Sequence, residues 1–506
     1  MKQFLKKHED RLVGILSGLD RIIFNATPGF LRYAAGVEMF LSANRIHWRD
    51  FGKLVHSMSD KVKAHAEQMA KAKGRTYQYL QSANVSKENL ARQIMERDGI
   101  EQGLVCVLSC VELCQTYGLG KNRSGQWGVK PQLRKCLHLY FYFVDREFGL
   151  MHIRLQSWLP FRVQIYVNGR EWLARRLQRA GINFEKQDNC ITHVEDWQRA
   201  QGYLDELLVR NWVPLLNAWV RRVNPWAQSR SRYPIGWHYW CVRQSEYATD
   251  LIFDKAATLE QLYPALVRHA ITDFQTPDVL RFLGRKQRRG KVWSRMLEPM
   301  EGLRVKHWVE ENSIKMYNKG GHVLRVETTI NNPRRFKTRR WITKRGRRVL
   351  TWGTLRKSVM DLKRRAAVSD LANRRYLQAL AAVGTSRLGC QVLDPVSRPV
   401  IEKERRYRAL RPISPEDSQR LGVLIRGEFL IGGFRNRDLH AGWDNSAQHT
   451  EQQISGQITR WLRILRAHRV IYKIPATHRY QLTQKGRELI TTARRLRTAN
   501  IAALAA

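Results

Sequence analysis

Four carboxylates lie on or beside segments that are predicted to be β-strands, where they can take part in phosphodiester chemistry. They are Asp145, Glu246, Asp250 and Glu327. Two or more of them gathered at one point would hold Mg²⁺ ions for in-line cleavage of a phosphodiester. The spacing in SEYATD puts Glu246 and Asp250 on the same side of a strand or of a helix. The alternative, common in a basic chain, is that each acid is an ion-pair partner of arginine.

The segment NSIKMYNKGGHVLRVETTI, residues 312–330, is predicted to form a β-hairpin around its Gly-Gly turn. We expect this hairpin to bring together Tyr317, Lys319, Arg325 and Glu327. A strand with Tyr and Lys followed by a strand reading LRVE resembles, over about 20 residues, replication initiators of some rolling-circle plasmids and filamentous phages. The resemblance implies that Tyr317 cleaves one DNA strand beside a metal ion. The two-histidine metal motif of many such enzymes is not visible, because LHLYF has one histidine.

A basic ribbon follows this hairpin. Residues 331–360 contain 11 lysines and arginines and no acidic residue. We expect the ribbon to bind phosphates through Arg334, Arg335, Lys337, Arg339, Arg340, Lys344, Arg345, Arg347 and Arg348. The alternative is a disordered positive loop, which would still attract nucleic acid without sequence preference. Tryptophans such as Trp158, Trp172, Trp341 and Trp352 can stack on unpaired bases, although most should belong to the core.

The whole chain is strongly basic, with 89 Lys and Arg against 44 acidic residues and a formal net charge of +45. Such an excess indicates a polyanionic partner, because each cationic contact with a phosphate backbone adds to the binding affinity. DNA is the preferred candidate and RNA is the second. An anionic membrane surface is the competing partner, but no run of 18 apolar residues exists to span a bilayer. The oligomeric state cannot be read from the sequence.

Targeting and cysteine content favour a cytoplasmic protein. The N-terminus MKQFLKKHEDRLVGILSGLDR lacks the continuous apolar core of a signal peptide. Seven cysteines, an odd and widely spread set, argue against the disulfide framework of a secreted protein. Cys106, Cys110 and Cys114 fall on one face of their segment, and we expect them to be core residues, because zinc sites usually need a fourth ligand and tighter pairs. No metal ligands are therefore assigned.

The C-terminal part gives the most compact pattern. Ser414 caps a first helix, a short second helix follows, and the third helix, in EQQISGQITRWLRILRAHRVI, has apolar residues at helical spacing. Two short strands around residues 475–478 and a last helix complete the segment. This order of three helices, a hairpin and a helix resembles, over about 90 residues, the winged helix of MarR-type and related bacterial regulators. The passage LRAHRVIYKIPATHRYQLTQKG is similar to the recognition helix and wing of that superfamily.

This winged-helix resemblance implies contact with duplex DNA. On the non-core faces of the third helix, amide and guanidinium groups can contact base edges in a major groove. The residues are Gln453, Gln457, Arg460 and Arg463. His478 and Arg479, at the tip of the wing, can reach the DNA backbone or the minor groove. The alternative is a solvated polar face on a domain that only packs against the rest of the chain.

The sequence as a whole predicts an α+β, multi-domain protein with antiparallel sheets, covering helices and a C-terminal winged helix. The expected parts are a helical region (1–98), an α+β domain (99–235), a central β-containing domain with the basic ribbon (236–383), a linker (384–413) and a winged helix (414–494). We interpret the chain as a DNA-binding protein of a mobile element or plasmid. The alternatives are a Mg²⁺-dependent nuclease, nickase or recombinase of rolling-circle type, and a binding protein for a structured RNA. Mg²⁺ is the one cofactor considered, and only for the enzyme.

Overall fold

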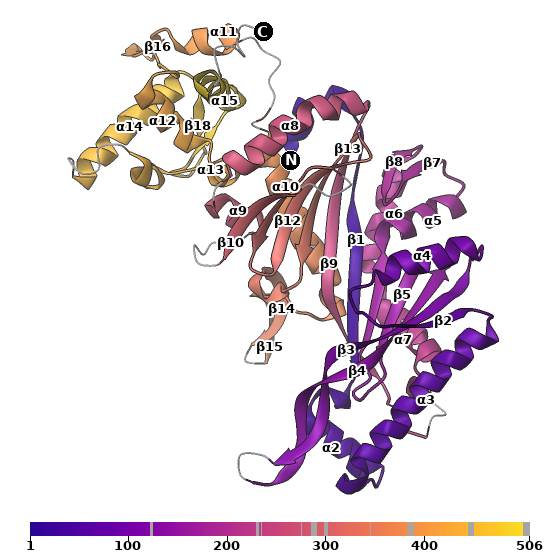
Figure 1. Ribbon diagram of the computed structural model, residues 1–506. Coiled ribbons are helices and arrows are strands. Elements are labelled where there is room, and N and C mark those ends of the chain that lie inside the picture. Colours follow the sequence, from indigo (N-terminus) through magenta and orange to yellow (C-terminus); the bar gives the residue numbers. More distant parts are fainter. Residues whose placement is uncertain are drawn as a thin grey trace. The chain divides into compact units, whose positions relative to one another are not determined.

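The computed structural model divides the chain into two compact units (Figure 1). The first unit is formed by Met1–Ile15, Thr249–Thr328 and Asp370–Ala506, and the second by Leu16–Ala248 and Thr329–Ser369. Both units contain strands and helices, which confirms the predicted α+β, multi-domain class. The described residues are 1–121, 125–228, 232–233, 235–274, 276–284, 291–297, 302–344, 346–381, 383, 389–443 and 450–498.

The second unit is built on a mixed sheet. Its strands, in hydrogen-bonded order, are β9 (His238–Phe253), β1 (Leu12–Pro28), β6 (Val163–Asn168), β5 (Gly149–Gln156), β4 (Trp127–Asp145), β3 (Gly103–Lys121) and β2 (Thr76–Leu80). β2 runs parallel to β3, whereas the pairs β3–β4, β4–β5, β5–β6 and β1–β6 are antiparallel. β9 and β1 also contribute residues to the first unit.

Helices cover both faces of this sheet. They are α2 (Ala34–Ala43), α3 (Phe51–Ala72), α4 (Lys87–Arg97), α5 (Gly169–Arg179), α6 (Trp197–Val209) and α7 (Trp212–Val223). Successive residues of β4 alternate between two cores: Tyr140 packs in a cluster with Ile94 of α4, while Phe141 packs in a larger cluster with Val55 of α3. This alternation is the two-residue period of a strand that is buried on both sides. A small hairpin, β7 (Phe184–Gln187) and β8 (Cys190–Val194), lies outside the sheet.

Two predicted hairpins are confirmed. β4 and β5 meet at the predicted turn, where Asp145 accepts hydrogen bonds from the backbone N–H groups of Glu147 (2.8 Å) and Phe148 (3.1 Å). Gly149 has φ +61°, a conformation that other residues rarely adopt. β12 (Asn312–Lys319) and β13 (Val323–Ile330) form the predicted hairpin at residues 312–330.

The first unit carries a second set of strands and the C-terminal segment. Its strands follow the order β10 (Val292–Leu297), β11 (Arg304–Val309), β12, β13 and the end of β9. Its helices include α1 (Lys2–Lys7), α8 (Ala256–Thr272), α9 (Thr276–Phe282) and the C-terminal half of α10 (Leu362–Leu380). No helix in the described part of the chain has the length and apolar character needed to cross a bilayer.

The C-terminal elements appear in the predicted order. They are α12 (Pro415–Leu424), α13 (Gly427–Gly432), the 3-10 helix η8 (Asn436–Gly442), α14 (Glu451–Ala467), β18 (Ile471–Lys473), β19 (Tyr480–Leu482) and α15 (Gln484–Thr498). The Ser414 side chain caps α12 through the N–H of Asp417 at 3.4 Å. Ile454, Ile458 and Leu462 of α14 are buried in the core of this segment, as their helical spacing predicts.

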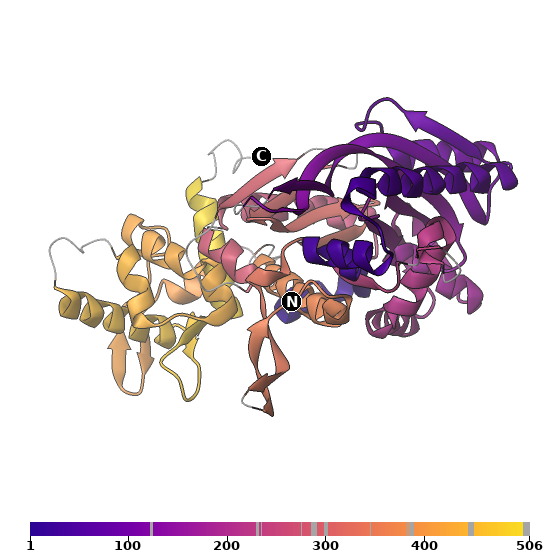
Figure 2. The same ribbon diagram turned by 90° about the horizontal axis from the view of Figure 1, so that it is seen from below.

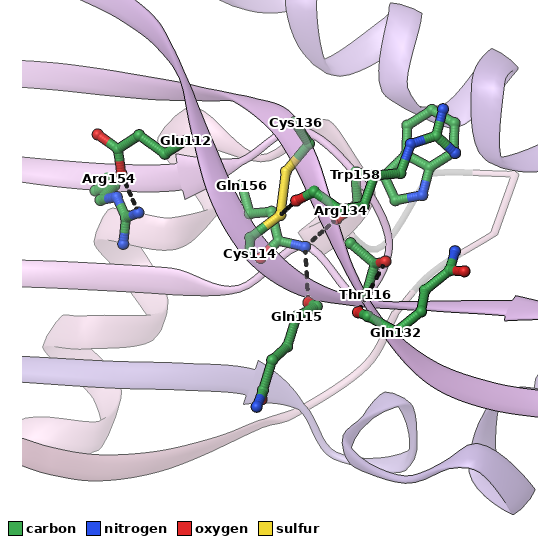
Figure 3. The surroundings of a disulfide bond; sticks show 10 residues. All are labelled: Glu112, Cys114, Gln115, Thr116, Gln132, Arg134, Cys136, Arg154, Gln156 and Trp158. Atoms are coloured by element: carbon green, nitrogen blue, oxygen red, sulfur yellow. Dashed lines mark hydrogen bonds and ion pairs between the residues drawn. A yellow bond between two sulfur atoms is a disulfide. The ribbon is translucent and has the colours of Figure 1, made fainter. Parts of the chain in front are cut away.

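One local prediction was incomplete and two were wrong. Helices cover more than half of the region 1–98, as predicted, but the region also contains the 17-residue strand β1, which was not expected. The expected linker (384–413) contains, in its described part, α11 (Gly389–Leu393) and the hairpin of β16 (Val400–Glu402) and β17 (Arg405–Tyr407). Cys114 is not a plain core residue, because it forms a disulfide with Cys136 (Figure 3).

Candidate nucleic-acid interface

The basic ribbon forms an antiparallel hairpin of two eight-residue strands. β14 (Lys337–Lys344) pairs with β15 (Arg347–Thr354) along its whole length, and the hairpin projects as a two-stranded arm (Figure 2). Residues that face each other across an antiparallel pair lie on the same side of the sheet. The register therefore defines two faces of the arm, which differ in burial.

One face of this hairpin combines cations with aromatic side chains. Arg339 lies opposite Trp352, and Trp341 lies opposite Leu350. Trp341 is 56% exposed and Trp352 is 66% exposed, and such values are unusual for tryptophan. The guanidinium carbon of Arg348 lies 5.9 Å from the centre of the Trp341 ring. We call this surface the basic-aromatic face; it consists of Lys337, Arg339, Trp341, Thr343, Arg348, Leu350, Trp352 and Thr354.

The opposite face anchors the hairpin to its unit through Arg340. This side chain is buried and donates hydrogen bonds to the Asp361 carboxylate (3.1 Å) and the Thr354 carbonyl (3.0 Å). A Cβ atom at Gly353 would come within 2.6 Å of the Arg340 side chain, so only glycine leaves room for it. The prediction that Arg340 binds phosphate is therefore corrected, because its charge is neutralised inside the protein.

A second buried arginine fixes the helix that follows the hairpin. Arg365 of α10 is fully buried and donates hydrogen bonds to the Val242 carbonyl (2.7 Å), the Ile330 carbonyl (2.5 Å) and the Ser245 hydroxyl (3.2 Å). Burial lowers the pKa of this guanidinium to about 9. Since Ile330 ends β13 and precedes the hairpin in the chain, Arg365 holds both ends of the segment that carries the arm.

The remaining cations predicted for the ribbon are exposed where the structure describes them. The exposed side chains are those of Arg334, Arg335, Lys337, Arg339, Arg347 and Arg348. The side chain of Lys344 and the whole of Arg345 lie outside the described residues. The Trp158 and Trp172 side chains are buried, so of the four tryptophans named above only Trp341 and Trp352 are available for stacking.

On α14, the third helix of the C-terminal segment, two arginines are exposed, whereas two glutamine side chains accept hydrogen bonds within the protein. Arg460 and Arg463 are exposed. Gln453 accepts a hydrogen bond from the Thr450 N–H at 2.9 Å and so completes a capping box. Gln457 accepts one from the Trp443 indole N–H at 2.9 Å. The oxygen atom of each amide is therefore engaged within the protein, and base contacts by Gln453 and Gln457 stay a prediction.

At the expected tip of the wing, one of the two predicted side chains is exposed and the other is hydrogen-bonded to the backbone. His478 is exposed. The Arg479 guanidinium donates hydrogen bonds to the carbonyl oxygens of Gly432 (2.8 Å) and Gly433 (3.0 Å), which close the turn after α13. Arg479 therefore ties the strand pair to α13 and is not a free cation at the tip.

In the first unit the predicted catalytic residues form two separate contacts. Asp250 accepts two hydrogen bonds from Arg325, at 2.6 and 2.8 Å, and both side chains are buried. Glu327 accepts a hydrogen bond from the Tyr317 hydroxyl at 3.1 Å, and the Lys315 ammonium lies 2.8 Å from its other oxygen. Tyr317 and Glu327 thus meet as predicted, but Arg325 is paired with Asp250, and Lys315 takes the place expected for Lys319.

Within the second unit, the two predicted acids Asp145 and Glu246 do not meet each other. Asp145 caps the β4–β5 turn described above. Glu246 lies on β9, and its carboxylate comes within 4.8 Å of the Asp20 carboxylate on β1. The Arg21 guanidinium lies 3.9 Å from Glu246. Asp20 was missed from the sequence, although an acid between Leu19 and Ile22 in an apolar strand is the signal that reveals it.

The chain matches no family model, no curated protein and no solved structure.

Proposed function

We propose that the protein binds nucleic acid, with DNA as its main partner, through the basic-aromatic face of the β14–β15 hairpin. The observation that carries this proposal is the pair of exposed tryptophans, Trp341 and Trp352, among exposed arginines. Lysine and arginine release counterions from a phosphate backbone, which provides affinity without sequence preference. Indole rings stack on unpaired bases and contribute about 1–3 kcal/mol per base.

The shape of the arm supports this role. A two-stranded ribbon is narrow enough to enter a major groove or to lie along a single strand. The net charge of +45 supplies attraction over the whole chain. The ordered C-terminal segment supports a second contact, in which Arg460 and Arg463 of α14 face duplex DNA in the manner of a winged helix.

The test is a binding measurement with the full chain. Fluorescence anisotropy is measured with labelled single-stranded DNA, duplex DNA and RNA of one sequence at low ionic strength. We expect submicromolar binding of single-stranded DNA that weakens steeply as salt is raised. Tighter binding of RNA than of both DNA forms would identify RNA as the partner. No binding to any of the three would refute the proposal.

A second candidate function is Mg²⁺-dependent cleavage of a DNA strand. The observation that favours it is the Asp20–Glu246 carboxylate pair, because two carboxylates at this distance can share a divalent cation. End-labelled single-stranded DNA is incubated with the protein and Mg²⁺, with Glu246→Gln as the comparison. Cleavage by the native chain that Glu246→Gln abolishes would support it, and intact DNA in both reactions would leave binding as the function.

A further inference from the structure

Three possible metal-binding residues meet on one face of the β3–β4 pair. Cys114 lies on β3, and Cys136 and His138 lie two residues apart on β4. Across the strands, Cys114 is opposite Arg134 and Glu112 is opposite Cys136, so the two cysteines are diagonal neighbours on one face. Figure 3 shows the two sulfur atoms joined and the surrounding polar side chains.

The donor atoms of these residues are close together and shielded from solvent. The two sulfur atoms and a ring nitrogen of His138 all lie within 4.8 Å of one another. His138 is 2% exposed, and its Nδ1 atom is buried without a hydrogen-bond partner among the described residues. An unpaired buried polar atom costs free energy unless it meets a partner. A metal ion is a partner that an imidazole nitrogen and two sulfur atoms can share.

The same face opens into a polar pocket of the second unit. The pocket has a volume of about 580 Å³, and Cys114 and His138 belong to its lining. Arg154, Arg162 and Arg243 also line it. A ligand bound at this face can therefore be reached from solvent.

We propose that Cys114, Cys136 and His138 bind Zn²⁺ when the cysteines are reduced, and that the disulfide is the oxidised, metal-free form of this site. Zinc prefers thiolate and imidazole ligands in a tetrahedron, with bonds of about 2.3 Å to sulfur and about 2.0 Å to nitrogen. Such bonds place the donor atoms about 3.5–3.8 Å apart. Three protein ligands leave a fourth position for water or a pocket ligand, as in catalytic zinc sites.

The neighbouring carboxylate is not the fourth ligand. Glu112 accepts a hydrogen bond from the Tyr140 hydroxyl at 2.5 Å, contacts the Arg154 guanidinium, and lies 3.7 Å from the Lys87 ammonium. These partners neutralise its charge and occupy its oxygen atoms. The proposed fourth position is therefore left for water or a ligand in the pocket.

Conversion of the disulfide form into the zinc-binding form requires a thiol reductant such as dithiothreitol. The disulfide accepts two electrons and two protons from the reductant, which becomes a disulfide, and yields two thiols. Zinc binding then releases the two thiol protons. An oxidant such as diamide takes two electrons from the thiolates, re-forms the S–S bond and expels the zinc ion.

The experiment measures zinc and thiols in the full chain. The protein is equilibrated with micromolar zinc, with dithiothreitol or after diamide treatment, desalted, and analysed by inductively coupled plasma mass spectrometry. We expect one zinc ion per reduced chain and none per oxidised chain. Thiol titration in denaturant with a chelator should give all seven cysteines in the reduced chain and the five free cysteines in the oxidised chain.

Variants and a spectroscopic probe identify the ligands. Cys136→Ser and His138→Gln should lose the zinc ion, whereas Cys106→Ser, which removes a free buried thiol of the same β3–β4 pair, should retain it. Cobalt titration of the reduced native chain should give thiolate-to-cobalt charge-transfer absorption, a readout that needs no variant. A reduced chain that binds neither metal, or zinc that survives diamide or Cys136→Ser, would overturn the proposal.

Discussion

Arg339 and Trp352 lie directly opposite each other on the β14–β15 hairpin, so a cation and a 66% exposed indole share one face of a projecting arm. A buried tryptophan would contribute apolar area to the core, and this one does not. Leaving two such rings in water has a free-energy cost that a bound partner can offset. This cost is the reason why we propose the hairpin as the surface that binds a ligand.

Removing the two exposed rings should weaken binding without unfolding the arm. We expect the double variant Trp341→Ala/Trp352→Ala to bind single-stranded DNA about five- to 150-fold less tightly per lost stack, because each stacked base contributes about 1–3 kcal/mol. Anisotropy measures the affinity. The matched control is Trp127→Ala, which removes a 57% exposed indole from another hairpin and should leave the affinity within twofold. An equal loss of DNA affinity in both variants would contradict the assignment of Trp341 and Trp352 as the residues that stack on bases.

On α14, substitution of Arg460 or Arg463 should affect DNA binding, whereas substitution of Gln457 should affect stability. Arg460→Ala and Arg463→Ala should each cost about 1–3 kcal/mol of duplex DNA binding and leave the melting temperature unchanged. Gln457→Ala should instead lower the stability by about 1 kcal/mol, because it removes the hydrogen bond from the Trp443 indole. Duplex binding and thermal unfolding are measured on the same preparations. A Gln457→Ala variant with native stability and weakened binding would reverse this assignment.

The buried pair of Asp250 and Arg325 should be structural. Asp250→Ala leaves the Arg325 guanidinium buried without its carboxylate, which we expect to cost about 3–5 kcal/mol of unfolding free energy. Urea denaturation followed by circular dichroism measures the loss. The double variant Asp250→Ala/Arg325→Met removes both charges and should recover most of it. If Asp250→Ala were as stable as the native chain, the pair would not contribute to the fold.

Acid should destabilise the first unit through His307. Its ring lies between the Ser294 hydroxyl (2.7 Å) and the Tyr376 hydroxyl (3.0 Å), and burial lowers its pKa from 6.5 to about 4. The unfolded chain therefore binds this proton first, so stability is complete above pH 6.5 and falls as the pH approaches 4, by about 3 kcal/mol. The variant His307→Gln should show a shallower decline between these pH values in urea denaturation. An identical decline in both proteins would contradict the role of His307.

Local features were predictable from the sequence because short-range patterns determine them. The turns at Asp145 and at residues 320–321, the apolar face of α14 and the order of the C-terminal elements all depend on residues close together in the chain. The hairpin at residues 312–330 also placed Tyr317 beside Glu327, since the strands are adjacent.

Long-range pairings were not predictable. The sequence could not show that Arg340 is neutralised by Asp361, that Arg325 pairs with Asp250 across 75 residues, or that Cys114 meets Cys136. Each of these contacts depends on strand register and on the packing of separate elements, which a single sequence does not reveal. For the same reason, the exposed state of Trp341 and Trp352 became evident only from the register of β14 and β15.

The salt dependence of DNA binding tests the central claim most directly. The slope of log K against log salt concentration is compared for the native chain and for the variant Lys337→Gln/Arg339→Gln/Arg348→Gln, which removes three cations of the basic-aromatic face. Each phosphate contact with single-stranded DNA contributes about 0.7 to this slope, so the account predicts that the variant loses about 2 units. An unchanged slope and affinity would show that the hairpin does not contact the phosphate backbone.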